Sequence, residues 1–574
     1  MAYKSLQKCL SDLERIGELK IIDNEVNPDL DIATIHLNEF SKAGKAILFE
    51  NVKGSKFKAV SNLFGTIDRT KYMFRNSLDT VKDLIKLKTD PVSALKNPLK
   101  AISTALNGIY AIPKKVRFKG FKEIKIKDLP QIRCWEKDGG SFITLPQVYS
   151  EDPENLGIMN SNLGMYRIQL SGNDYVENQE IGIHYQIHRG IGVHQKKANQ
   201  NGHPLKVSIF VGGPPSHTFA AVMPLPEGIS ELAFAGVLGK RRFRYSKKDG
   251  YMISADADFV ICGEIHYGDV KSEGPFGDHL GYYSLKHDFP FMRVKKVFAK
   301  ENAIWPFTVV GRPPQEDSNF GAFIHEITGK AIEKEIPGLK AVNAVDASGV
   351  HPLLLAIGSE RYTPYNPTKK PQELLTIANH ILGTGQMSLA KYLFICDEKD
   401  APSVNDEKEY FTHFLERVNW KRDLHFQTNT TIDTLDYSGD GINEGSKVVI
   451  AAAGDIKRNL SKKIDNNIDL PQGFLNAQLV SNGNLIIEGQ LEIQDLIFSL
   501  EKQNLDGIGL ITLVDDANFI TQDFSNWLWV TFTRSNPASD IYGLHSDTIN
   551  KHFSCSIPII DARIKKHHAP ILKR

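Results

Sequence analysis

Four short stretches of the sequence contain residue types that can carry out acid–base, metal and anion chemistry. They are residues 161–169 (SNLGMYRIQ), 184–192 (HYQIHRGIG), 223–236 (MPLPEGISELAFAG) and 272–283 (SEGPFGDHLGYY). Each stretch has an ordinary structural explanation when it is taken alone, because Gly-Pro and Gly-Asp pairs mark turns and a single polar residue often caps an element. The four stretches indicate chemistry only as a set.

Asn162, His188 and Glu231 supply an amide oxygen, an imidazole and a carboxylate. This mixture of oxygen and nitrogen donors suits a hard or borderline divalent cation such as Mn²⁺ or Mg²⁺. Arg189 and Gly190 add a cation and an open approach to the backbone, which together favour a phosphate group.

Arg167, Glu273 and Asp278 supply one guanidinium and two carboxylates. An arginine neighbour lowers the pKa of a carboxyl group, whereas burial or a second carboxylate raises it. Such a trio can keep one acid ionised while the other is ready to donate a proton.

The composition is that of a globular protein of several domains. The chain has 574 residues, which corresponds to about two to four domains, with 41% hydrophobic and 24% charged residues. The net charge of +1 gives no general electrostatic argument for a nucleic-acid partner. Five widely spaced cysteines favour free thiols in a reducing compartment over disulfides or a zinc site.

The sequence shows neither a secretory signal nor a membrane span. The first residues lack an apolar core with a cleavage site, and no run of 18 apolar residues occurs. We therefore expect a cytoplasmic location. We find no internal repeat in the sequence.

The elements that would position these residues fall into three regions. The first combines an amphipathic helix over residues 6–16, ended by Gly17, with two strands, residues 46–52 and 57–65. Residues 140–310 are mostly β and predict a barrel or sandwich, with strands at 206–213, 258–265 and 292–299. Beyond Pro337, a helix over residues 372–389 leads into an apolar strand, residues 392–396, which indicates another α/β region.

A basic segment, residues 82–127, holds twelve Lys/Arg against three Asp/Glu. Its apolar residues Leu95, Leu99, Ile102 and Leu106 fall on one face of a predicted helix. One interpretation is a surface helix with a solvated charged side. The other is a docking surface for an anionic membrane or a lipid-like substrate.

In their order and spacing, the four stretches resemble the UbiD family of decarboxylases. The similarity runs from Asn162 through GRPP (residues 311–314), and more weakly to TIDTLDYSG and GSK (residues 431–447). The most specific part is EGPFGD followed by HLGYY. We identify the sequence as a member of this family.

The resemblance implies a fold of the α/β (α+β multidomain) class. We expect an N-terminal α/β domain (residues 1–140) containing the basic insert, a central split β-barrel that binds flavin (141–325), and a C-terminal α/β domain (326–574) that mediates oligomerisation. The implied cofactors are prenylated FMN, a divalent metal (Mn²⁺, or Mg²⁺) and K⁺.

The resemblance also assigns roles to residues. Asn162, His188 and Glu231 take the metal-ligand positions, and Arg167, Glu273 and Asp278 the catalytic positions, with Asp278 as the proton donor. Residues 184–186 are His-Tyr-Gln where family members often carry Arg-Trp-Leu. The residues implied to contact the cofactor are Met165, Tyr166, Arg167, His184, Tyr185, Gln186, Arg189, Gly190 and Lys447.

The implied function is the reversible, non-oxidative decarboxylation of an aromatic or α,β-unsaturated acid. Loss of CO₂ from an sp² carbon leaves a carbanion, for which the cofactor provides the electron sink. By family association we expect a prenylated hydroxybenzoate-like substrate in ubiquinone or menaquinone biosynthesis, a flavin prenyltransferase as cofactor supplier, a homo-oligomer (dimer or hexamer) and peripheral contact with the inner membrane. Two alternatives are an FMN-dependent oxidoreductase on a split barrel and a non-catalytic prenyl-flavin-binding protein.

Overall fold

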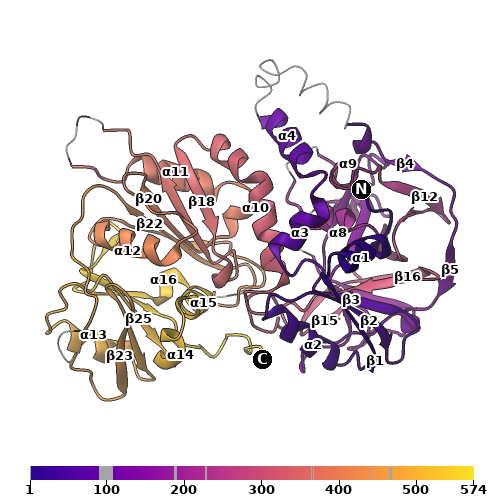
Figure 1. The fold of residues 1–574 in the computed structure, drawn as a ribbon. Coiled ribbons are helices and arrows are strands. Elements are labelled where there is room, and N and C mark those ends of the chain that lie inside the picture. The colour runs from indigo at the N-terminus through magenta and orange to yellow at the C-terminus, as the bar shows by residue number, and fades with distance from the viewer. Residues whose placement is uncertain are drawn as a thin grey trace. The chain divides into compact units, whose positions relative to one another are not determined.

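The computed structural model describes residues 2–89, 108–185, 190–225, 229–363, 365, 368–439, 441–464 and 468–573. The chain divides into two compact units (Figure 1). The first consists of Met1–Asp278, Tyr282–Ala331 and Ile571–Arg574, and the second of His279–Gly281 and Ile332–Pro570. Helix α10 (Glu316–Glu335) carries the chain from the first unit into the second.

The first unit begins with the predicted amphipathic helix. Helix α1 (Leu6–Arg15) starts at Ser5, whose side chain accepts a hydrogen bond from the backbone N–H of Lys8. Gly17 follows in the left-handed region, with φ of +78°, so the predicted glycine stop is confirmed. The residues of α1 that pack into the core are Leu6, Cys9, Leu10 and Leu13.

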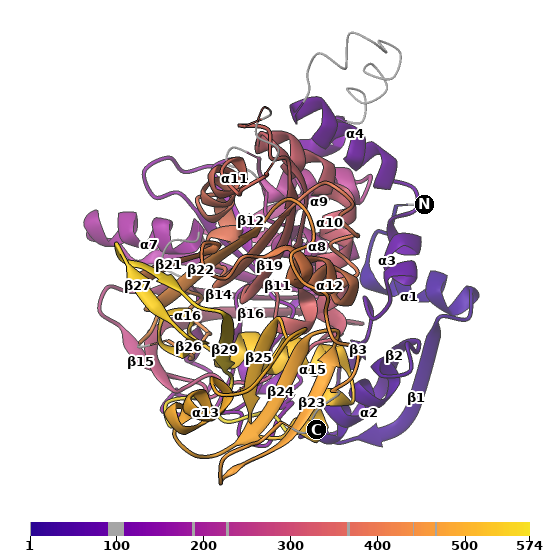
Figure 2. The ribbon, with the colours of Figure 1, turned by 90° about the vertical axis from the view of Figure 1, so that its left-hand side faces the viewer.

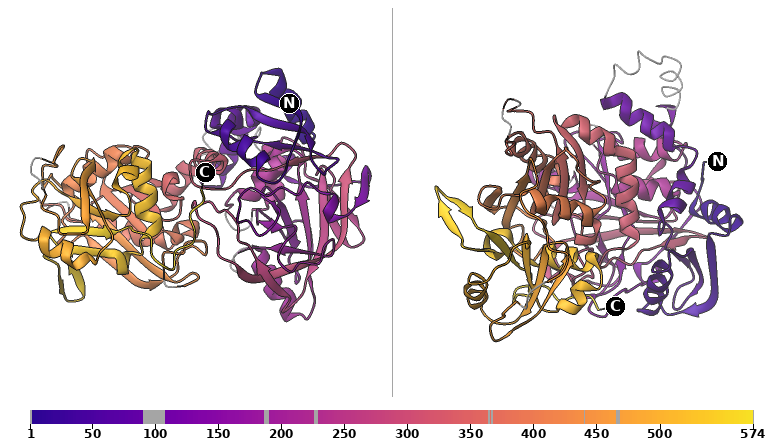
Figure 3. Two further views of the ribbon diagram at one scale, coloured as in Figure 1. Left: turned by 90° about the horizontal axis from the view of Figure 1, so that it is seen from below. Right: turned by 60° about the vertical axis from the view of Figure 1, so that its left-hand side comes forward.

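A four-stranded sheet in the order β1–β2–β3–β17 follows α1 and contains both strands predicted in this region. The second of them is shorter than predicted, because Asn62 turns the chain with φ of +54°. Figures 1 and 3 show these indigo elements beside the magenta central sheet. The bounds are β1 (Leu19–Val26), β2 (Ala46–Val52), β3 (Lys58–Ser61), β17 (Ile304–Pro306), α2 (Asp31–Phe40), α3 (Ile67–Phe74) and α4 (Leu78–Thr89).

The basic segment is described only in part. The helix predicted around Leu95–Leu106 falls within residues 90–107, which lie outside the described residues. The segment continues through η1 (Gly108–Ala111), β4 (Lys114–Lys115), β5 (Phe121–Ile124) and η2 (Ile126–Asp128).

The centre of the first unit is a ten-stranded sheet, which confirms that this region is mostly β. Its order is β6–β9–β10–β16–β14–β11–β7–β8, with β15 and β5 also paired to the long strand β16. Closure of this sheet into a split barrel stays a prediction. The strands are β6 (Phe142–Ile143), β7 (Gln147–Glu151), β8 (Ser161–Gly164), β9 (Ile168–Gln169), β10 (Glu180–Ile183), β11 (Leu205–Val211), β14 (Phe259–Ile265), β15 (Val270–Glu273) and β16 (His287–Lys300).

Three helices and a small sheet complete this unit. The small sheet has the order β13–β12–β4, in which the basic strand β12 pairs with β4 from the basic segment. The bounds are α7 (Gly190–Gln200), α8 (Pro215–Val222), α9 (Glu231–Leu238), β12 (Arg244–Lys248) and β13 (Tyr251–Ser254).

The second unit contains two five-stranded sheets, drawn one below the other in Figure 2. The first sheet has the order β18–β19–β20–β22–β21 and includes the predicted apolar strand as β20. The predicted helix is confirmed from Glu373 to Leu382. It ends at Gly383, and a 3-10 turn (η4, Gly385–Leu389) follows. The other bounds are β18 (Leu339–Ala344), η3 (Asp346–Ser348), β19 (Leu353–Gly358), α11 (Glu373–Leu382), β20 (Tyr392–Asp397), α12 (Glu407–Arg417), β21 (Leu424–Thr430) and β22 (Gly445–Ala452).

The second sheet of this unit has the order β23–β24–β25–β29–β26. A separate hairpin, β27–β28, is inserted between the strands β26 and β29 of this sheet. The bounds are β23 (Phe474–Ser481), β24 (Asn484–Gly489), α13 (Ile493–Leu500), β25 (Leu510–Val514), α14 (Ala517–Thr521), α15 (Phe524–Arg534), α16 (Pro537–Asp540), β26 (Ile541–Leu544), β27 (Asp547–Ile549), β28 (His552–Ser554) and β29 (Ile557–Asp561).

Two predictions about the whole chain can be compared with the structure. All five cysteines are free and buried, as predicted for free thiols. Within the described ranges, no helix is long and apolar enough to cross a membrane.

Candidate active site

Arg167, Glu273 and Asp278, which lie far apart in the sequence, form one hydrogen-bonded cluster in the first unit. Arg167 precedes β9, Glu273 ends β15, and Asp278 lies in the loop that follows. The guanidinium holds both oxygens of Glu273, with Nε donating to Oε1 at 2.9 Å and Nη2 to Oε2 at 2.7 Å. Its third nitrogen, Nη1, donates to Oδ2 of Asp278 at 2.6 Å. This planar fork fits two carboxylates in a way that a lysine cannot.

The cluster is largely shielded from water and is buttressed by neighbouring groups. Glu273 is fully buried and Asp278 is 6% exposed. Ser284 Oγ accepts from Arg167 Nη2 at 3.1 Å and from the backbone N–H of Phe276 at 3.1 Å. The Phe276 ring lies 5.0 Å from the guanidinium carbon, within the range of a cation–π contact. Low exposure strengthens each of these electrostatic contacts.

Asp138 holds the loop that carries Asp278, a role that the sequence did not predict. Its carboxylate accepts from the backbone N–H of Gly277 at 2.8 Å, and from those of Cys134 and Trp135 at 3.2 Å and 3.0 Å. Burial raises the pKa of Asp138 to about 7, against the lowering effect of these three donors. Asp138 therefore changes charge near neutral pH while fixing the backbone one residue before Asp278.

Two further polar side chains fix the start of the same loop. Gln169 Oε1 accepts from the backbone N–H of Gly274 at 2.9 Å, and Asn173 Nδ2 donates to the Gly274 carbonyl at 2.8 Å. Gly274 has φ of +84°, a conformation that favours glycine. The Gly-Pro-Phe-Gly run is thus a constrained connection between the two acidic residues.

Of the three predicted metal ligands, Glu231 lies against the backbone of the residue that follows Asn162. Glu231 is the first residue of α9, and its Oε2 accepts from the backbone N–H of Leu163, the neighbour of Asn162, at 3.3 Å. Burial raises the pKa of Glu231, and a bound cation would offset the cost of burying its charge. Asn162 and Glu231 therefore fit a divalent ion chemically. His188 lies outside the described residues.

The predicted cofactor segments meet across the ends of adjacent strands. Strand β9 pairs with β10, and beyond this pairing the backbone N–H of His184 donates to the Arg167 carbonyl at 3.1 Å. The rings of Tyr166 and Tyr185 lie 6.1 Å apart. Met165 belongs to the same segment, and its backbone N–H donates to the Ala221 carbonyl at 2.8 Å.

Gly190 is the first residue of α7 and lies against Asn162, one of the predicted metal ligands. A Cβ at Gly190 would lie 2.1 Å from Asn162 Oδ1, so this position excludes larger residues. Gln186 and Arg189, two other predicted cofactor contacts, lie outside the described residues.

Lys447 belongs to β22 in the second unit. Its Nζ donates to the carbonyls of Ala390 and Ser388 at 3.1 Å and 2.5 Å, and burial lowers its pKa to about 8.

Solved structures share this fold. Vanillic acid decarboxylase of Sedimentibacter hydroxybenzoicus in its closed form matches with a TM-score of 0.67 and 23% identity, over 82% of this chain and 97% of its own. An evolved dimeric form of the UbiD-class enzyme HmfF from Pelotomaculum thermopropionicum, in complex with prFMN, matches with a TM-score of 0.59 and 20% identity, over 81% of this chain and 97% of its own. The fold is thus that of UbiD-class enzymes.

Sequence comparison identifies the family. Residues 10–88, 111–313 and 318–452 match the N-terminal, Rift-related and C-terminal domains of the UbiD family, 3-octaprenyl-4-hydroxybenzoate carboxy-lyase. A Chlamydia pneumoniae protein, named as one of the subunits of a 4-hydroxybenzoate decarboxylase, is 36% identical over 566 residues, 94% of this chain and 90% of its own. A Chlamydia trachomatis protein is 35% identical over 97% of this chain and 94% of its own. The chain belongs to the UbiD family of carboxy-lyases, which confirms the resemblance found in the sequence.

Proposed function

We propose that the protein decarboxylates an aromatic or α,β-unsaturated acid without net oxidation, using prenylated FMN and a divalent metal. The observation that carries the proposal is the buried contact of Arg167 with two carboxylates, Glu273 and Asp278. Family membership supports the reaction class, and the prFMN complex of HmfF supports the cofactor.

The trio gives its two acids different roles. Arg167 holds Glu273 through both carboxylate oxygens, whereas it binds Asp278 through Oδ2 alone. Glu273 therefore fixes the guanidinium, and the guanidinium orients the substrate. Asp278 delivers the proton to the carbon from which CO₂ has left.

The bound prenylated FMN would supply an electron sink for the charge left by decarboxylation. Asn162, His188 and Glu231 would hold Mn²⁺ or Mg²⁺ beside the cofactor phosphate, with K⁺ as a further ion. Arg189, Gly190 and Lys447 are proposed phosphate contacts. The remaining proposed cofactor contacts are Met165, Tyr166, Arg167, His184, Tyr185 and Gln186.

We further propose a prenylated hydroxybenzoate-like substrate in quinone biosynthesis. The name of the Chlamydia pneumoniae relative supports a hydroxybenzoate. The proposed domains are residues 1–140, 141–325 and 326–574, with the second closing as a split barrel. We also propose that a flavin prenyltransferase supplies the cofactor and that the protein is a homo-oligomer. Its proposed location is the cytoplasm, peripheral to the inner membrane.

The cofactor assignment is tested with protein co-expressed with a flavin prenyltransferase. We expect the purified protein to carry a modified flavin, identified by absorbance and mass, and Asn162→Ala to lose it. Asn160→Ala, two residues away and exposed, should retain it. A wild-type protein that binds no flavin under these conditions would overturn the proposal.

A further inference from the structure

The two sheets of the second unit have the same topology, although we found no repeat in the sequence. We call residues 339–452 the first copy and residues 474–561 the second copy. In the first, the successive pairings β18–β19, β19–β20, β20–β22 and β22–β21 are antiparallel, parallel, parallel and antiparallel. In the second, β23–β24, β24–β25, β25–β29 and β29–β26 follow the same sequence of directions. Figure 2 shows the two sheets one below the other.

Each copy buries a hydrophobic core of its own. In the first, Leu393 and Ile395 of β20 pack with Ile377 of α11. In the second, Leu485 of β24 and Ile511 of β25 pack with α13, through residues that include Leu496. Helices α11 and α13 occupy equivalent places, each between the second and third strands of its sheet. The likeness therefore extends from strand order to packing.

The likeness also reaches individual hydrogen bonds. From the last residue of α12 the sequence is RVNWKRD (residues 417–423), and from the last residue of α15 it is RSNPASD (534–540). The backbone N–H of Asn419 donates to Asp423 Oδ2 at 2.8 Å, and that of Asn536 donates to Asp540 Oδ2 at 2.7 Å. The same turn is built twice from Asn and Asp at the same spacing.

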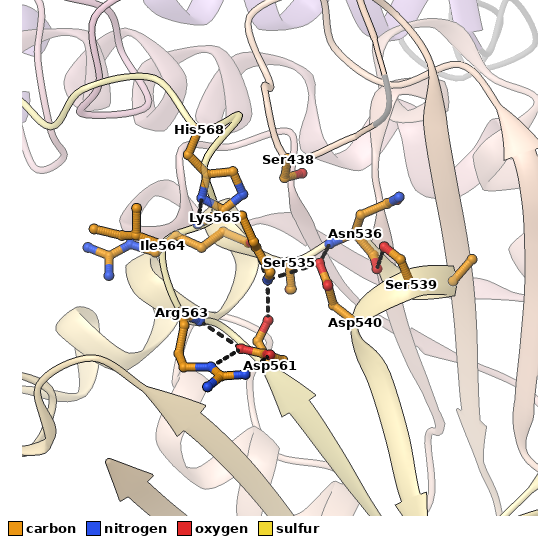
Figure 4. Close-up of polar contacts among 12 residues, drawn as sticks. Ser438, Ser535, Asn536, Ser539, Asp540, Asp561, Arg563, Ile564, Lys565 and His568 are labelled. Atoms are coloured by element: carbon orange, nitrogen blue, oxygen red, sulfur yellow. Dashed lines mark hydrogen bonds and ion pairs between the residues drawn. The ribbon is translucent and has the colours of Figure 1, made fainter. Parts of the chain in front are cut away.

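A lysine that lies four or five residues beyond the end of each copy binds the last carbonyl of the helix before this turn. Lys457 Nζ donates to the carbonyl of Arg417 at 2.5 Å and to the carbonyl of Ala453, four residues before the lysine, at 2.9 Å. Lys565 Nζ donates to the carbonyl of Arg534 at 3.1 Å and to the carbonyl of Asp561, four residues before the lysine, at 2.6 Å. Figure 4 shows Lys565 beside Asp540 and Asp561. Such agreement in detail indicates a duplication rather than a shared general architecture.

The two copies contact each other reciprocally. Lys391, directly before β20, donates to the carbonyl of Ser535, directly after α15, at 2.9 Å. Gly509, directly before β25, accepts from the indole N–H of Trp420, three residues after α12, at 2.7 Å. Equivalent regions thus exchange partners, which is the pattern of a twofold interface between identical subunits.

A second pair of contacts repeats this reciprocity. Ser446, near the start of β22, donates its backbone N–H to Asn536 Oδ1 at 2.9 Å. Cys555, shortly before β29, donates its backbone N–H to the carbonyl of Trp420 at 3.3 Å. The residues of each copy that contact the other therefore lie in matching regions of the fold.

Two lysines near this interface each form an ion pair on their own side of it. The fully buried ammonium of Lys391 forms an ion pair with Asp436 at 2.8 Å and donates to Ser438 Oγ at 2.6 Å. Lys565 forms an ion pair with Asp540 at 3.1 Å. Neither ion pair crosses the interface, so each neutralises a lysine on its own side, while hydrogen bonds join the two copies.

The second copy has kept the fold but not the family sequence. The match to the family's C-terminal domain ends at residue 452, so the second copy lies outside it. The TIDTLDYSG and GSK motifs have no counterpart in the second copy, where the β27–β28 hairpin lies between β26 and β29. The second copy keeps its contacts with the first copy but lacks the family motifs. This combination indicates that the second copy supports the first.

The second copy also contacts the segment next to Asp278. Trp529 on α15 donates its indole N–H to the carbonyl of Leu280 at 2.8 Å. Residues 279–281 belong to the second unit, whereas Asp278 belongs to the first. On the first copy, Gly349 leaves space for Leu280, because a Cβ there would lie 2.2 Å from Leu280 Cδ2. Residues 279–281, which directly follow Asp278 in the chain, are thus held by both copies.

We propose that the second copy is an internal partner. It binds the first copy through the surface that the same domain of a second chain would otherwise use, and it supplies Trp529 as a positioning residue for the Asp278 loop. The positioning role rests on the proposed function, whereas the pairing of the copies does not.

The pairing is tested by cross-linking the full-length double variant His425→Cys/His552→Cys with a short bismaleimide. These side chains lie on β21 and β28, with ring centroids 5.5 Å apart. We expect a link within one chain, identified by peptide mass, and none in either single variant. A two-chain product would overturn the proposal, and so would the absence of a link when both cysteines react with a monofunctional maleimide.

The positioning role is tested by Trp529→Phe, with Trp527→Phe as a matched control. Trp527 lies on the same helix and donates to Thr512 Oγ1 within the second copy at 3.0 Å. We expect Trp529→Phe to lower kcat about fivefold, the equivalent of one hydrogen bond, with KM and flavin content unchanged, and Trp527→Phe to retain the wild-type kcat. Equal effects of the two variants on kcat, or none from Trp529→Phe, would contradict the role. If the wild-type holoenzyme shows no decarboxylation, the proposed function fails, and the cross-link still decides the pairing.

Discussion

Arg167→Lys is the substitution that most directly perturbs the proposed catalytic cluster. Among the described residues, the guanidinium donates two hydrogen bonds to Glu273 and one each to Asp278 and Ser284. A lysine ammonium cannot span both carboxylates, so we expect it to keep about two of these bonds. Each lost charge-assisted bond is worth about 1.5 kcal/mol or more. The free energy of unfolding should therefore fall by about 3 kcal/mol.

In Arg167→Lys, kcat should fall by more than the loss of folded protein explains. Asp278 loses the bond to Nη1 that fixes its Oδ2, and a displacement of about 1 Å can cost about 10²-fold in rate. We expect kcat to drop by about two orders of magnitude. Urea denaturation and steady-state CO₂ release measure the two effects separately.

Arg133→Lys is the matched control for this prediction. Arg133 also binds one carboxylate through two nitrogens, at 2.6 Å and 3.1 Å from Asp29, but the Asp29 side chain is 51% exposed. An exposed pair contributes less than about 1 kcal/mol, and this one lies outside the proposed site. If Arg167→Lys retains kcat within about threefold, or if the two variants lose equal stability, the reasoning is refuted.

Three further predictions concern groups with shifted pKa values. Because burial raises the pKa of Asp138 from 3.8 to about 7, its contribution to stability is complete below about pH 4 and is lost as pH rises through about 7. Asp138→Asn should remove that slope from urea denaturation between about pH 5 and pH 7, and an unchanged slope would contradict the assignment. Glu231→Gln should weaken Mn²⁺ binding about tenfold or more without lowering the stability of the metal-free protein, because burial raises the pKa of Glu231. Unchanged Mn²⁺ affinity in a titration would argue against its ligand role. Burial lowers the pKa of Lys447 from 10.5 to about 8, so the wild type should gain stability as pH rises from about 8 to about 10.5. Lys447→Met should lack that gain, and an equal gain in both proteins would count against the burial argument.

The sequence predicted that Arg167, Glu273 and Asp278 act together, but it did not predict the groups that support them. Arg167, Glu273 and Asp278 stand in motifs long enough to be recognised, and the structure places them within hydrogen-bond distance. Asp138 and Ser284 lie in no such motif. Asp138 acts on Gly277, a residue distant in the chain, and no local pattern encodes that approach.

The duplication was missed for a related physical reason. A strand requires only an alternating or apolar pattern, so two copies of a fold can share strand order while their sequences diverge. What persists is the turn in which the carboxylates of Asp423 and Asp540 accept from the backbone N–H of Asn419 and Asn536. The helix that we predicted through residue 389 ends at Gly383. A glycine ends a helix more reliably than an apolar periodicity extends it.

The most direct test of the central claim is CO₂ release by the holoenzyme from a panel of aromatic and α,β-unsaturated acids. We predict release from at least one acid, retained in Asp288→Asn, an exposed neighbour of the cluster. Asp278→Asn, at equal flavin content, should be slower by about 10²-fold or more, the usual contribution of a general acid. A flavin-loaded wild type that releases no CO₂ from any acid but oxidises NAD(P)H, or full activity in Asp278→Asn, would contradict the account.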